Sequence, residues 1–329
     1  MKPYYEDDSV QLFHGRCEDI LPGLSLTGSV HLLTDPPYFK VKDNDWDNQW
    51  SKSAEFLDWM GEWLDLAKPH LSPDASVWVF ASPALTSAVE SVVAQRFRVL
   101  NSVRWVKQGS MAHRASIDSV RSHISFWEGI VFAEQSDDEP ETVAAPIGAY
   151  IRSERERSGV SRTVIQALFP SVNGNTTGAL SNWEIGYNMP SREQYATLRE
   201  SMGEGFLSRD YDELVAEYVA LRREFEDQRR PFNLKDRKRL GDIWDFPSVP
   251  PYAGRHVCEK PVGLLTHMIE TTTRPGDTII DCFAGSGAVL DVARQLGRKA
   301  VGIEMDEHWC KQATKRLSQQ TFDLEALGA

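Results

Sequence analysis

Hydrophobic positions in the first 135 residues follow two alternating patterns. Residues 76–81 are apolar almost without interruption, which is typical of a strand buried on both faces of a sheet. Residues 53–69 carry apolar side chains at helical spacing, with Ser53 as the candidate N-cap. We expect further strands at residues 9–13, 29–34, 97–107 and 124–133, and a further helix at residues 84–95. This alternation predicts a mostly parallel sheet with helices on its faces.

The pattern becomes purely helical between residues 148 and 233, after an acidic linker at residues 135–141. One apolar stripe in this region consists of Tyr211, Leu214, Val215, Tyr218, Leu221 and Phe225. Strands and helices alternate again from Gly241, with helices expected at 261–273 and 288–296 and strands at 278–280 and 299–303. We therefore predict one α/β domain formed by residues 1–145 and 236–329, interrupted by a helical insert at residues 146–235.

Charge and composition narrow the range of functions. The 329 residues include 48 acidic and 36 basic side chains, for a formal charge of −12. This balance argues against a protein that coats nucleic acid non-specifically, but it allows a local basic groove. The four cysteines are isolated in sequence, so we expect no metal site or disulfide framework and a reducing cytoplasm. We also expect no membrane span and no signal peptide, because no apolar run is long enough and the N-terminus is polar.

A glycine-containing turn follows the strand predicted at residues 278–280. Residues 281–287 read Asp-Cys-Phe-Ala-Gly-Ser-Gly, and Gly285 and Gly287 allow a tight turn and a close approach of the backbone to a ligand. Glu304 ends the next strand, where a carboxylate can accept hydrogen bonds from ribose hydroxyls. The turn has no third glycine spaced for a pyrophosphate. It therefore suits a nucleoside without phosphates, and the alternative is a merely structural strand-to-helix turn.

A second candidate site is the tetrapeptide Asp35-Pro36-Pro37-Tyr38, which follows an apolar strand. It should lie at the carboxyl end of the sheet, where open α/β sheets bind ligands. The two prolines fix the backbone and leave the Pro36 carbonyl free to accept a hydrogen bond. With the Asp35 carboxylate and the ring of Tyr38, this arrangement suits an exocyclic amino group on a planar base. The alternative is a rigid turn with a solvated aspartate.

Together these segments resemble the amino-directed DNA methyltransferases of the β group, which use S-adenosylmethionine. The tetrapeptide resembles their catalytic motif, and Lys260-Pro261 followed by residues 275–287 resembles their cofactor motif. Residues 301–304, Val-Gly-Ile-Glu, resemble the strand that holds the ribose. The order of catalytic motif, insert and cofactor motif is the circularly permuted order of that group. The resemblance covers about residues 1–135 and 240–315.

The resemblance implies a Rossmann-like, seven-stranded methyltransferase sheet, S-adenosylmethionine as cofactor and a base flipped out of double-stranded DNA. It implies that Asp35 and the Pro36 carbonyl hold the target amino group, that Pro37 belongs to the same rigid turn, and that Tyr38 stacks on the base. The implied cofactor-binding residues are Lys260, Pro261, Asp281, Phe283, Ala284, Gly285, Ser286, Gly287, Glu304 and Met305. One position departs from the family, because Arg16 follows Gly15 where a carboxylate is usual. Glu18, Asp19 or another contact would then serve the cofactor adenine.

The insert resembles the helix-turn-helix of phage-repressor-type regulators, although its loop at residues 170–177 is longer than usual. By that analogy Thr177, Ser181 and Asn182 would contact DNA, whereas Trp183 would pack in a small core. Basic residues that could track phosphates follow downstream: Arg222, Arg223, Arg229, Arg230, Lys235, Arg237, Lys238 and Arg239. The alternatives are a helical spacer without DNA contact and charged helix faces that are simply solvated.

These observations predict a site-specific adenine-N6 DNA methyltransferase that works by direct transfer without a metal ion. Cytosine-N4 methylation is the nearest alternative, since the resemblance implies the same fold and motif geometry for it, while aspartate at position 35 favours adenine. RNA or protein amide methylation fits less well, because such enzymes typically have asparagine there. A DNA-binding regulator built on an inactive methyltransferase is a third hypothesis. A homodimer is implied by the family alone.

Overall fold

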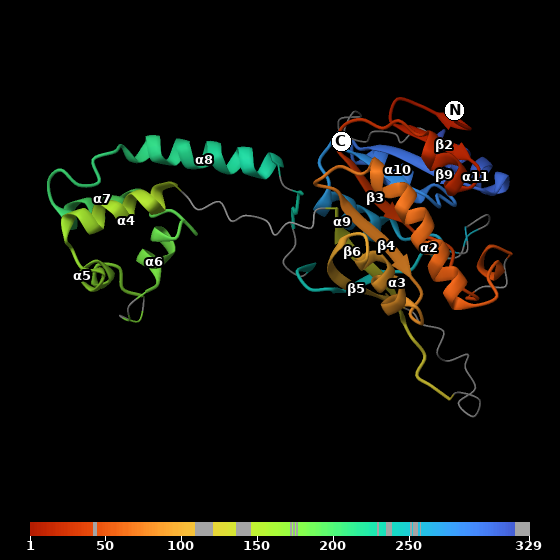
Figure 1. Ribbon diagram of the computed structural model, residues 1–329, viewed down its shortest axis with the longest axis horizontal. Helices are drawn as coiled ribbons and strands as arrows, with labels where there is room; N and C mark the ends of the chain where they lie inside the picture. Colours follow the sequence, from red (N-terminus) through yellow and green to blue (C-terminus); the bar gives the residue numbers. More distant parts are fainter. Residues whose placement is uncertain are drawn as a thin grey trace. The chain divides into compact units, whose positions relative to one another are not determined.

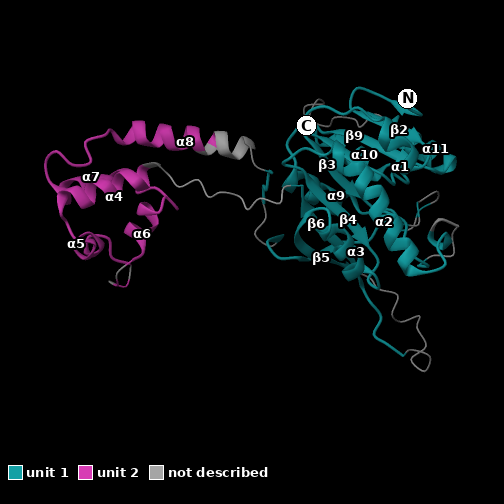
Figure 2. Cartoon of the chain, viewed as in Figure 1, with its two compact units in different colours: residues 1–138, 230–329 teal, residues 139–229 magenta. Residues whose placement is uncertain are grey.

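The computed structural model describes residues 1–41, 45–108, 121–135, 146–171, 173, 175, 177–228, 230–234, 239–250, 252, 256 and 258–319. The chain divides into two compact units, of which unit 1 comprises residues 1–138 and 230–329 and unit 2 comprises residues 139–229 (Figure 2). This division differs by a few residues from the boundaries expected for the insert. Residues 136–141 of the expected acidic linker lie outside the described residues.

Unit 1 contains one sheet, to which the described residues contribute nine strands in the order β1-β2-β9-β8-β3-β4-β6-β5-β7 (Figure 1). The strands are β1 (Tyr5–Glu6), β2 (Val10–His14), β3 (Val30–Thr34), β4 (Ser76–Ala81), β5 (Arg98–Gln108), β6 (Trp127–Glu134), β7 (Ile243–Pro247), β8 (Thr278–Asp281) and β9 (Lys299–Glu304). Neighbours from β2 to β4 pair in parallel, whereas β6 runs antiparallel to β4 and β5. The predicted α/β class, with a mostly parallel central sheet, is therefore confirmed.

The predicted count of seven strands is wrong by the two outermost strands. Strand β1 is a two-residue addition that pairs antiparallel with β2. Strand β7 extends the opposite edge by pairing in parallel with β5. In β7 only Trp244 and Phe246 are buried, and they alternate with exposed residues as expected for an edge strand with one covered face. Five alternating residues between loops are a weak signal, and the sequence pattern did not reveal this strand.

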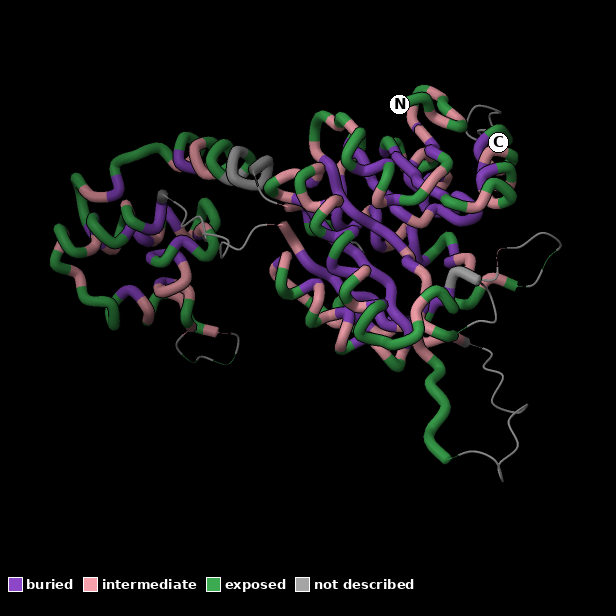
Figure 3. Tube along the Cα trace, turned by 45° about the vertical axis from the view of Figure 1, so that its right-hand side comes forward, coloured by how far each residue is buried: buried purple, intermediate pink, exposed green. Residues whose placement is uncertain are grey.

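Helices cover both faces of the sheet, so its central strands are buried (Figure 3). One face packs against α1 (Cys17–Ile20), α2 (Ser53–Ala67) and α3 (Thr86–Ala94). The other face packs against α9 (Val262–Thr272), α10 (Ala288–Gln295) and α11 (Glu307–Leu317). Among the described helices, each falls short of the length or apolarity that a membrane crossing requires.

The start of α2 corrects one expectation, because Ser53 is the first helical residue and Lys52 occupies the N-cap position. The Glu55 carboxylate accepts hydrogen bonds from the backbone N–H of Ser51 (3.0 Å) and of Lys52 (3.4 Å). These bonds satisfy amide groups that have no partner within the helix. The Glu55 carboxylate in the first turn therefore provides the hydrogen bonds at the helix start that were expected from Ser53.

The centre of the sheet joins chain segments about 250 residues apart in sequence. Strand β3 pairs in parallel with β8, and Val30, His31 and Leu32 lie opposite Thr278, Ile279 and Ile280. This pairing places the end of β3, where the Asp35 tetrapeptide begins, beside the end of β8, where the glycine turn begins. The two candidate motifs therefore lie at one edge of the sheet.

Unit 2 is a small helical body with its own core. Its helices are α4 (Pro146–Ser158), α5 (Arg162–Ala167), α6 (Ala179–Glu184), α7 (Arg192–Met202) and α8 (Tyr211–Gln228). Ser161 caps α5 by accepting a hydrogen bond from the Val164 backbone N–H. Trp183 is only 2% exposed within this core, which confirms its predicted packing role.

Candidate active site

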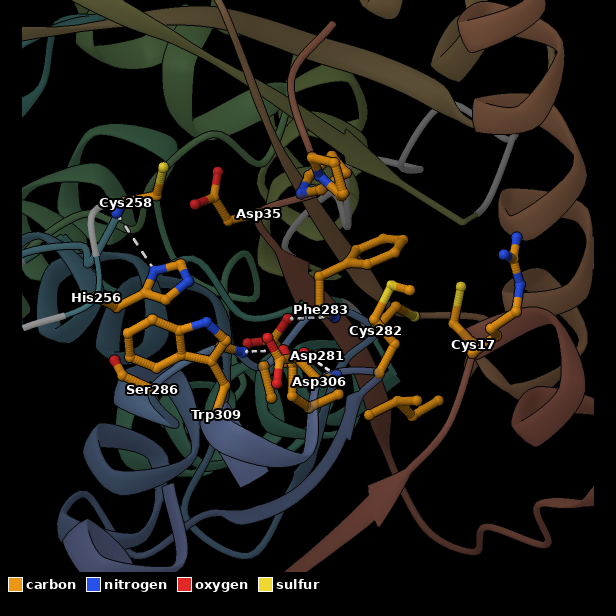
Figure 4. A pocket seen from close by; sticks show the side chains of 18 of the residues that line it. Cys17, Asp35, His256, Cys258, Asp281, Cys282, Phe283, Ser286, Asp306 and Trp309 are labelled. Carbon is orange, nitrogen blue, oxygen red and sulfur yellow. Dashed lines mark hydrogen bonds between the residues drawn. The ribbon is translucent and has the colours of Figure 1, made fainter. Parts of the chain in front are cut away.

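A cavity of about 880 Å³ opens at the carboxyl ends of β2, β3, β8 and β9. Its wall contains the Asp35 tetrapeptide, most of the glycine turn, and residues 14–18 after β2. Figure 4 shows Cys17 at one side of this cavity, with His256 and Trp309 at the other and Asp35 between them at the rim. Open parallel sheets bind ligands at this position.

Asp35 is held by side chains from both ends of the chain. Its Oδ1 accepts a hydrogen bond from the Tyr38 hydroxyl at 2.8 Å, and its Oδ2 accepts one from the Lys260 ammonium. The backbone N–H of Tyr38 donates to Oδ1 of Asp47 at 2.8 Å, which fixes the turn itself. The alternative of a rigid turn with a solvated aspartate is wrong, because the Asp35 side chain is only 17% exposed.

Lys260 also faces a second carboxylate, that of Glu128 in β6. Its Nζ lies 3.4 Å from Oε2 of Glu128, and Oε1 of Glu128 is bound by the ammonium of Lys107 in β5. Lys260 lies over the ring of Phe80, with its Nζ 4.7 Å from the ring centroid. The result is a network of two carboxylates and two ammonium groups at the wall of the cavity.

Burial and charge act in opposite directions on these groups. Burial raises the pKa of Asp35, and the Lys260 ammonium opposes that rise. Burial also acts to raise the pKa of Glu128, but Lys260 and Lys107 outweigh it and lower that pKa. The pKa of Lys260 is raised, because its two carboxylate neighbours outweigh the effect of burial. Lys260 is therefore an ammonium group across the physiological pH range.

Thr34 connects the two candidate motifs directly. Its hydroxyl donates to Oδ1 of Asp281 at 2.8 Å and accepts the backbone N–H of Cys282 at 3.1 Å. The backbone N–H of Phe283 donates to the same Asp281 oxygen at 3.1 Å. Burial raises the pKa of Asp281 to about 7, although the Thr34 hydroxyl opposes the rise. Asp281 therefore holds the turn in place and titrates near neutral pH.

The glycine turn is fixed by Glu304. Oε2 of Glu304 accepts the backbone N–H of Gly285 at 2.8 Å, and Oε1 accepts that of Asp306 at 2.7 Å. Gly285 and Gly287 have φ angles of +50° and +74°, in the left-handed region that favours glycine. Glu304 still lines the cavity, and each of its oxygens has a further lone pair for a ligand hydroxyl.

The position that departs from the family pattern has a nearby carboxylate. Arg16 and Glu18 both line the cavity, and the Arg16 guanidinium donates to Oε1 of Glu18 at 2.8 Å. The indole N–H of Trp59 donates to the same oxygen at 2.6 Å. Trp59 and Phe283 pack with their ring centroids 5.5 Å apart. Glu18, and not Asp19, thus places a carboxylate beside two aromatic rings in the cavity wall.

Most of the predicted catalytic and cofactor-binding residues meet at this cavity. The described residues of its wall include Asp35, Pro36, Pro37, Tyr38, Lys260, Asp281, Phe283, Ala284, Gly285, Ser286, Glu304 and Met305. Pro261 and Gly287 lie behind the wall as the N-caps of α9 and α10. Lys260, expected at the cofactor, instead directs its ammonium to Asp35.

Several residues of the site were not predicted. Trp59, His256, Cys258 and Trp309 line the cavity, and Glu128 joins the charged network behind it. His256 and Trp309 pack edge to face with centroids 4.2 Å apart (Figure 4). The sequence signal that could have singled out Glu128 was the presence of a carboxylate at the start of an apolar strand.

The residues predicted to contact DNA have mixed surroundings. Thr177 donates to the Phe169 carbonyl at 2.7 Å, and Ser181 accepts from Arg162 at 2.9 Å. Asn182 is partly exposed in α6, and Arg223 is exposed in α8. The Arg222 side chain and the residues Arg229, Lys235, Arg237 and Lys238 lie outside the described residues.

Two of the basic candidates are used inside unit 1. Nε of Arg230 donates to Oε2 of Glu134 at 2.8 Å, and the guanidinium lies over the Phe132 ring. Arg239 pairs with Asp245 at 3.1 Å and lies over the ring of Phe246 at 3.9 Å from its centroid. Both guanidinium groups therefore have structural partners already.

The chain is similar to known DNA methyltransferases. A family model described as DNA methylase matches residues 30–315. The Type II methyltransferase M2.DpnII of Streptococcus pneumoniae is 24% identical over 337 residues, covering 97% of this chain and 93% of that protein. The DNA adenine methyltransferase YhdJ of Escherichia coli (strain K12) is 37% identical over 91 residues, covering 27% of this chain and 30% of that protein.

Two solved structures share the fold. The crystal structure of the M1.HpyAVI–SAM complex has a TM-score of 0.53 at 17% identity, covering 94% of this chain and 100% of that chain. The PvuII DNA methyltransferase, which is cytosine-N4-specific, has a TM-score of 0.57 at 12% identity, covering 99% of this chain and 92% of that chain. At these identities the likeness concerns the fold.

Proposed function

The chain belongs to the DNA methylase family, and from that premise we propose that it transfers a methyl group from S-adenosylmethionine to the N6 amino group of adenine in double-stranded DNA. The observation that carries the proposal is the Thr34–Asp281 hydrogen bond of 2.8 Å. This bond joins the Asp35 tetrapeptide to the glycine turn across one cavity. A methyl acceptor at the first and a methyl donor at the second would lie side by side.

The cavity residues fit S-adenosylmethionine, which would supply an electrophilic methyl group on a sulfonium. Glu304 would accept hydrogen bonds from the ribose hydroxyls, and the turn at Gly285 would admit the nucleoside closely. Glu18 would accept from the amino group of the cofactor adenine, beside the packed rings of Trp59 and Phe283. Glu18 would then serve in place of the carboxylate that is usual at the position of Arg16.

Asp35 and the Pro36 carbonyl would act on the target base. Both oxygens would accept the hydrogens of the amino group, which directs the nitrogen lone pair towards the methyl group. The Asp35 carboxylate would stabilise the positive charge that develops on the amino nitrogen of the base, and that nitrogen would then release its proton to water. Most of the acceleration would come from holding the two reactants in line.

The choice of adenine over cytosine rests on two supports. One is the aspartate at position 35, which favours adenine in the β group. The other is the local similarity of 37% to a DNA adenine methyltransferase. Unit 2 would recognise the DNA sequence, with Asn182 and Arg223 as described candidates for contact. A homodimer and a cytoplasmic location stay predictions.

The test is to identify the methylated nucleoside. The protein is incubated with labelled S-adenosylmethionine and DNA from a host without DNA methylation, and the DNA is digested and resolved by mass spectrometry. We expect N6-methyladenine. N4-methylcytosine would replace the proposal by its nearest alternative. Tight sequence-specific binding without label transfer would instead identify a DNA-binding regulator.

The role of Asp35 is tested with Asp35→Asn, which keeps the shape of the side chain but removes its charge. We expect the single-turnover methylation rate to fall by about 10² to 10³-fold, the range seen when one stabilising group of a transition state is lost. Binding of S-adenosylmethionine, measured by calorimetry, should stay within about threefold. A variant of near-wild-type rate would remove Asp35 from the mechanism.

A further inference from the structure

The charged network behind Asp35 has no role in the function proposed so far. Lys260 pairs with both Asp35 and Glu128, and Lys107 pairs with Glu128, so side chains from β5, β6 and the segment before α9 meet at Asp35. The Lys260 side chain is 5% exposed and that of Glu128 is 13% exposed. Burying charged groups to this degree is costly unless they are paired.

We propose that Lys260 and Glu128 are positioning residues for methyl transfer, with Lys260 keeping Asp35 ionised and Glu128 balancing the charge of Lys260. The inference rests on the proposed function, because it concerns the same carboxylate. It changes the role predicted for Lys260 from cofactor binding to control of the catalytic acceptor.

The geometry around Lys260 carries this inference. Its Nζ binds Oδ2 of Asp35 and lies 3.4 Å from Oε2 of Glu128 and 3.4 Å from the Tyr38 hydroxyl. It also donates to the Cys258 carbonyl at 3.3 Å. These four oxygens surround the ammonium, so its position and its contact with Asp35 are fixed by the fold.

The charges of the network balance. Asp35 and Glu128 are two carboxylates in one buried region, and without a cation one of them would bind a proton. Lys260 lies between them, and Lys107 binds the far oxygen of Glu128. A protonated Asp35 would carry no negative charge with which to stabilise the positive charge that develops on the amino nitrogen. Lys260 therefore maintains the form of Asp35 that the reaction needs.

Other titratable groups face Asp35 as well. Tyr38 donates its hydroxyl to Oδ1, Asp281 lies at the end of neighbouring β8, and the Cys258 thiol belongs to the segment before Lys260. Burial raises the pKa of Tyr38 and raises that of Cys258 to about 11, so both are neutral at pH 7. Lys260 is thus a cation that pairs with both Asp35 and Glu128.

Lys260 and Glu128 shift the pKa of Asp35 in opposite directions. The ammonium of Lys260 lowers the pKa of Asp35, whereas the carboxylate of Glu128 raises it. Loss of the cation should raise the pKa of Asp35, and loss of the second carboxylate should lower it. A residue that merely supports the fold would not give this pair of opposite changes.

The experiment measures single-turnover methylation of the same unmethylated DNA from pH 5 to pH 9 with saturating S-adenosylmethionine. For Lys260→Met we expect the acidic limb of the rate profile to move up by at least one pH unit. For Glu128→Gln we expect the acidic limb to move to lower pH. Lys260→Arg should keep the limb near its wild-type position, because the charge is retained.

Lys68→Met is the matched control. Lys68 is also partly buried, binds the Arg96 carbonyl and lies over the Phe97 ring with its Nζ 5.3 Å from the centroid. It lies outside the site, and its replacement should leave the limb unchanged. Binding of S-adenosylmethionine should stay within about threefold in all four variants, and a large loss with Lys260→Met would instead make Lys260 a cofactor ligand.

The outcomes separate two failures. A wild-type protein that methylates no DNA refutes the proposed function. An active wild-type protein whose acidic limb stays fixed in Lys260→Met and Glu128→Gln refutes the positioning role alone. If Lys260→Met does not fold, as judged by circular dichroism, Glu128→Gln decides, and an unmoved limb in that variant overturns the inference.

Discussion

One hydroxyl group, that of Thr34, connects the strand that carries Asp35 to the strand that carries the glycine turn. Its acceptor, Asp281, is 1% exposed, and its hydrogen-bonded partners among the described residues are two neutral donors, the Thr34 hydroxyl and the Phe283 N–H. Two neutral donors stabilise a carboxylate less than an ion pair does. Burial therefore dominates and raises the pKa of Asp281 to about 7.

This pKa predicts a pH dependence of stability. In the unfolded chain the carboxyl of Asp281 has its ordinary pKa of 3.8, so between about pH 4 and pH 7 the native state binds a proton that the unfolded state releases. The contribution of Asp281 to stability is thus present at low pH and is lost as pH rises through 7. Asp281→Asn should therefore gain stability relative to wild type by up to about 1.4 kcal/mol per pH unit over that range.

Urea unfolding at pH 5, 6, 7 and 8 measures this effect. The difference in free energy of unfolding between Asp281→Asn and wild type should grow from pH 5 to pH 7 and level off above pH 8. A difference independent of pH would show that Asp281 ionises in the native state as it does in water.

At the scale of elements, the turn between β8 and α10 combines an unusual backbone conformation with close packing. Gly287 has φ +74°, and a Cβ atom at this position would lie 3.0 Å from the Cβ of Ala313 in α11. Gly297, after the same helix, has φ +73° with no atom within 4 Å of such a Cβ. The two glycines share a conformation and differ in what surrounds them.

Gly287→Ala should therefore be more destabilising than Gly297→Ala. The left-handed conformation costs an alanine about 1–2 kcal/mol at either site, and contact with Ala313 adds roughly 1–3 kcal/mol at position 287. Thermal or urea unfolding of both variants measures the difference. Equal losses would mean that α11 moves aside without cost.

Local patterns in the sequence predicted the helices and strands better than they predicted the contacts between distant side chains. Residues 76–81 were recognised as a buried strand because nearly every position is apolar, and β4 has those bounds. Glu128 was missed because its partner Lys260 is distant in sequence, and the network forms once β6 pairs with β4 and β5. The contact of Lys260 with Asp35 was missed for the same reason, since the two residues are 225 positions apart in sequence. Burial and long-range pairing decide these contacts, and a linear pattern does not record them.

At the scale of the whole molecule, the net charge of −12 requires that any attraction to DNA be local. The arginines that were predicted to contact phosphates differ in how exposed their side chains are. Arg230 is 16% exposed and bound to Glu134, which also accepts from Arg98 at 2.8 Å. Arg223 in α8 is exposed to solvent. Position in the fold therefore separates residues that the sequence grouped together.

Arg223→Gln and Arg230→Gln should have different effects. If Arg223 contacts a phosphate, its replacement should reduce the slope of log affinity against log salt by about 1. Arg230→Gln should leave that slope unchanged and lower the stability of unit 1 by about 1–3 kcal/mol, because a buried charge pair is broken. DNA-binding titrations at several salt concentrations, with urea unfolding in parallel, measure both quantities. The reverse pattern would place Arg230 on the DNA.

The pairing of β3 with β8 also has a consequence during synthesis on the ribosome. Strand β3 emerges early, but the strand that covers one of its edges is made about 250 residues later. At roughly 5–20 residues per second, that edge stays uncovered for on the order of ten seconds or longer. A nascent chain in this state presents an apolar strand with free backbone groups, which other strands can join. Slow synthesis of the last hundred residues should therefore favour aggregation. Chaperones that bind exposed strand edges should raise the yield of folded enzyme.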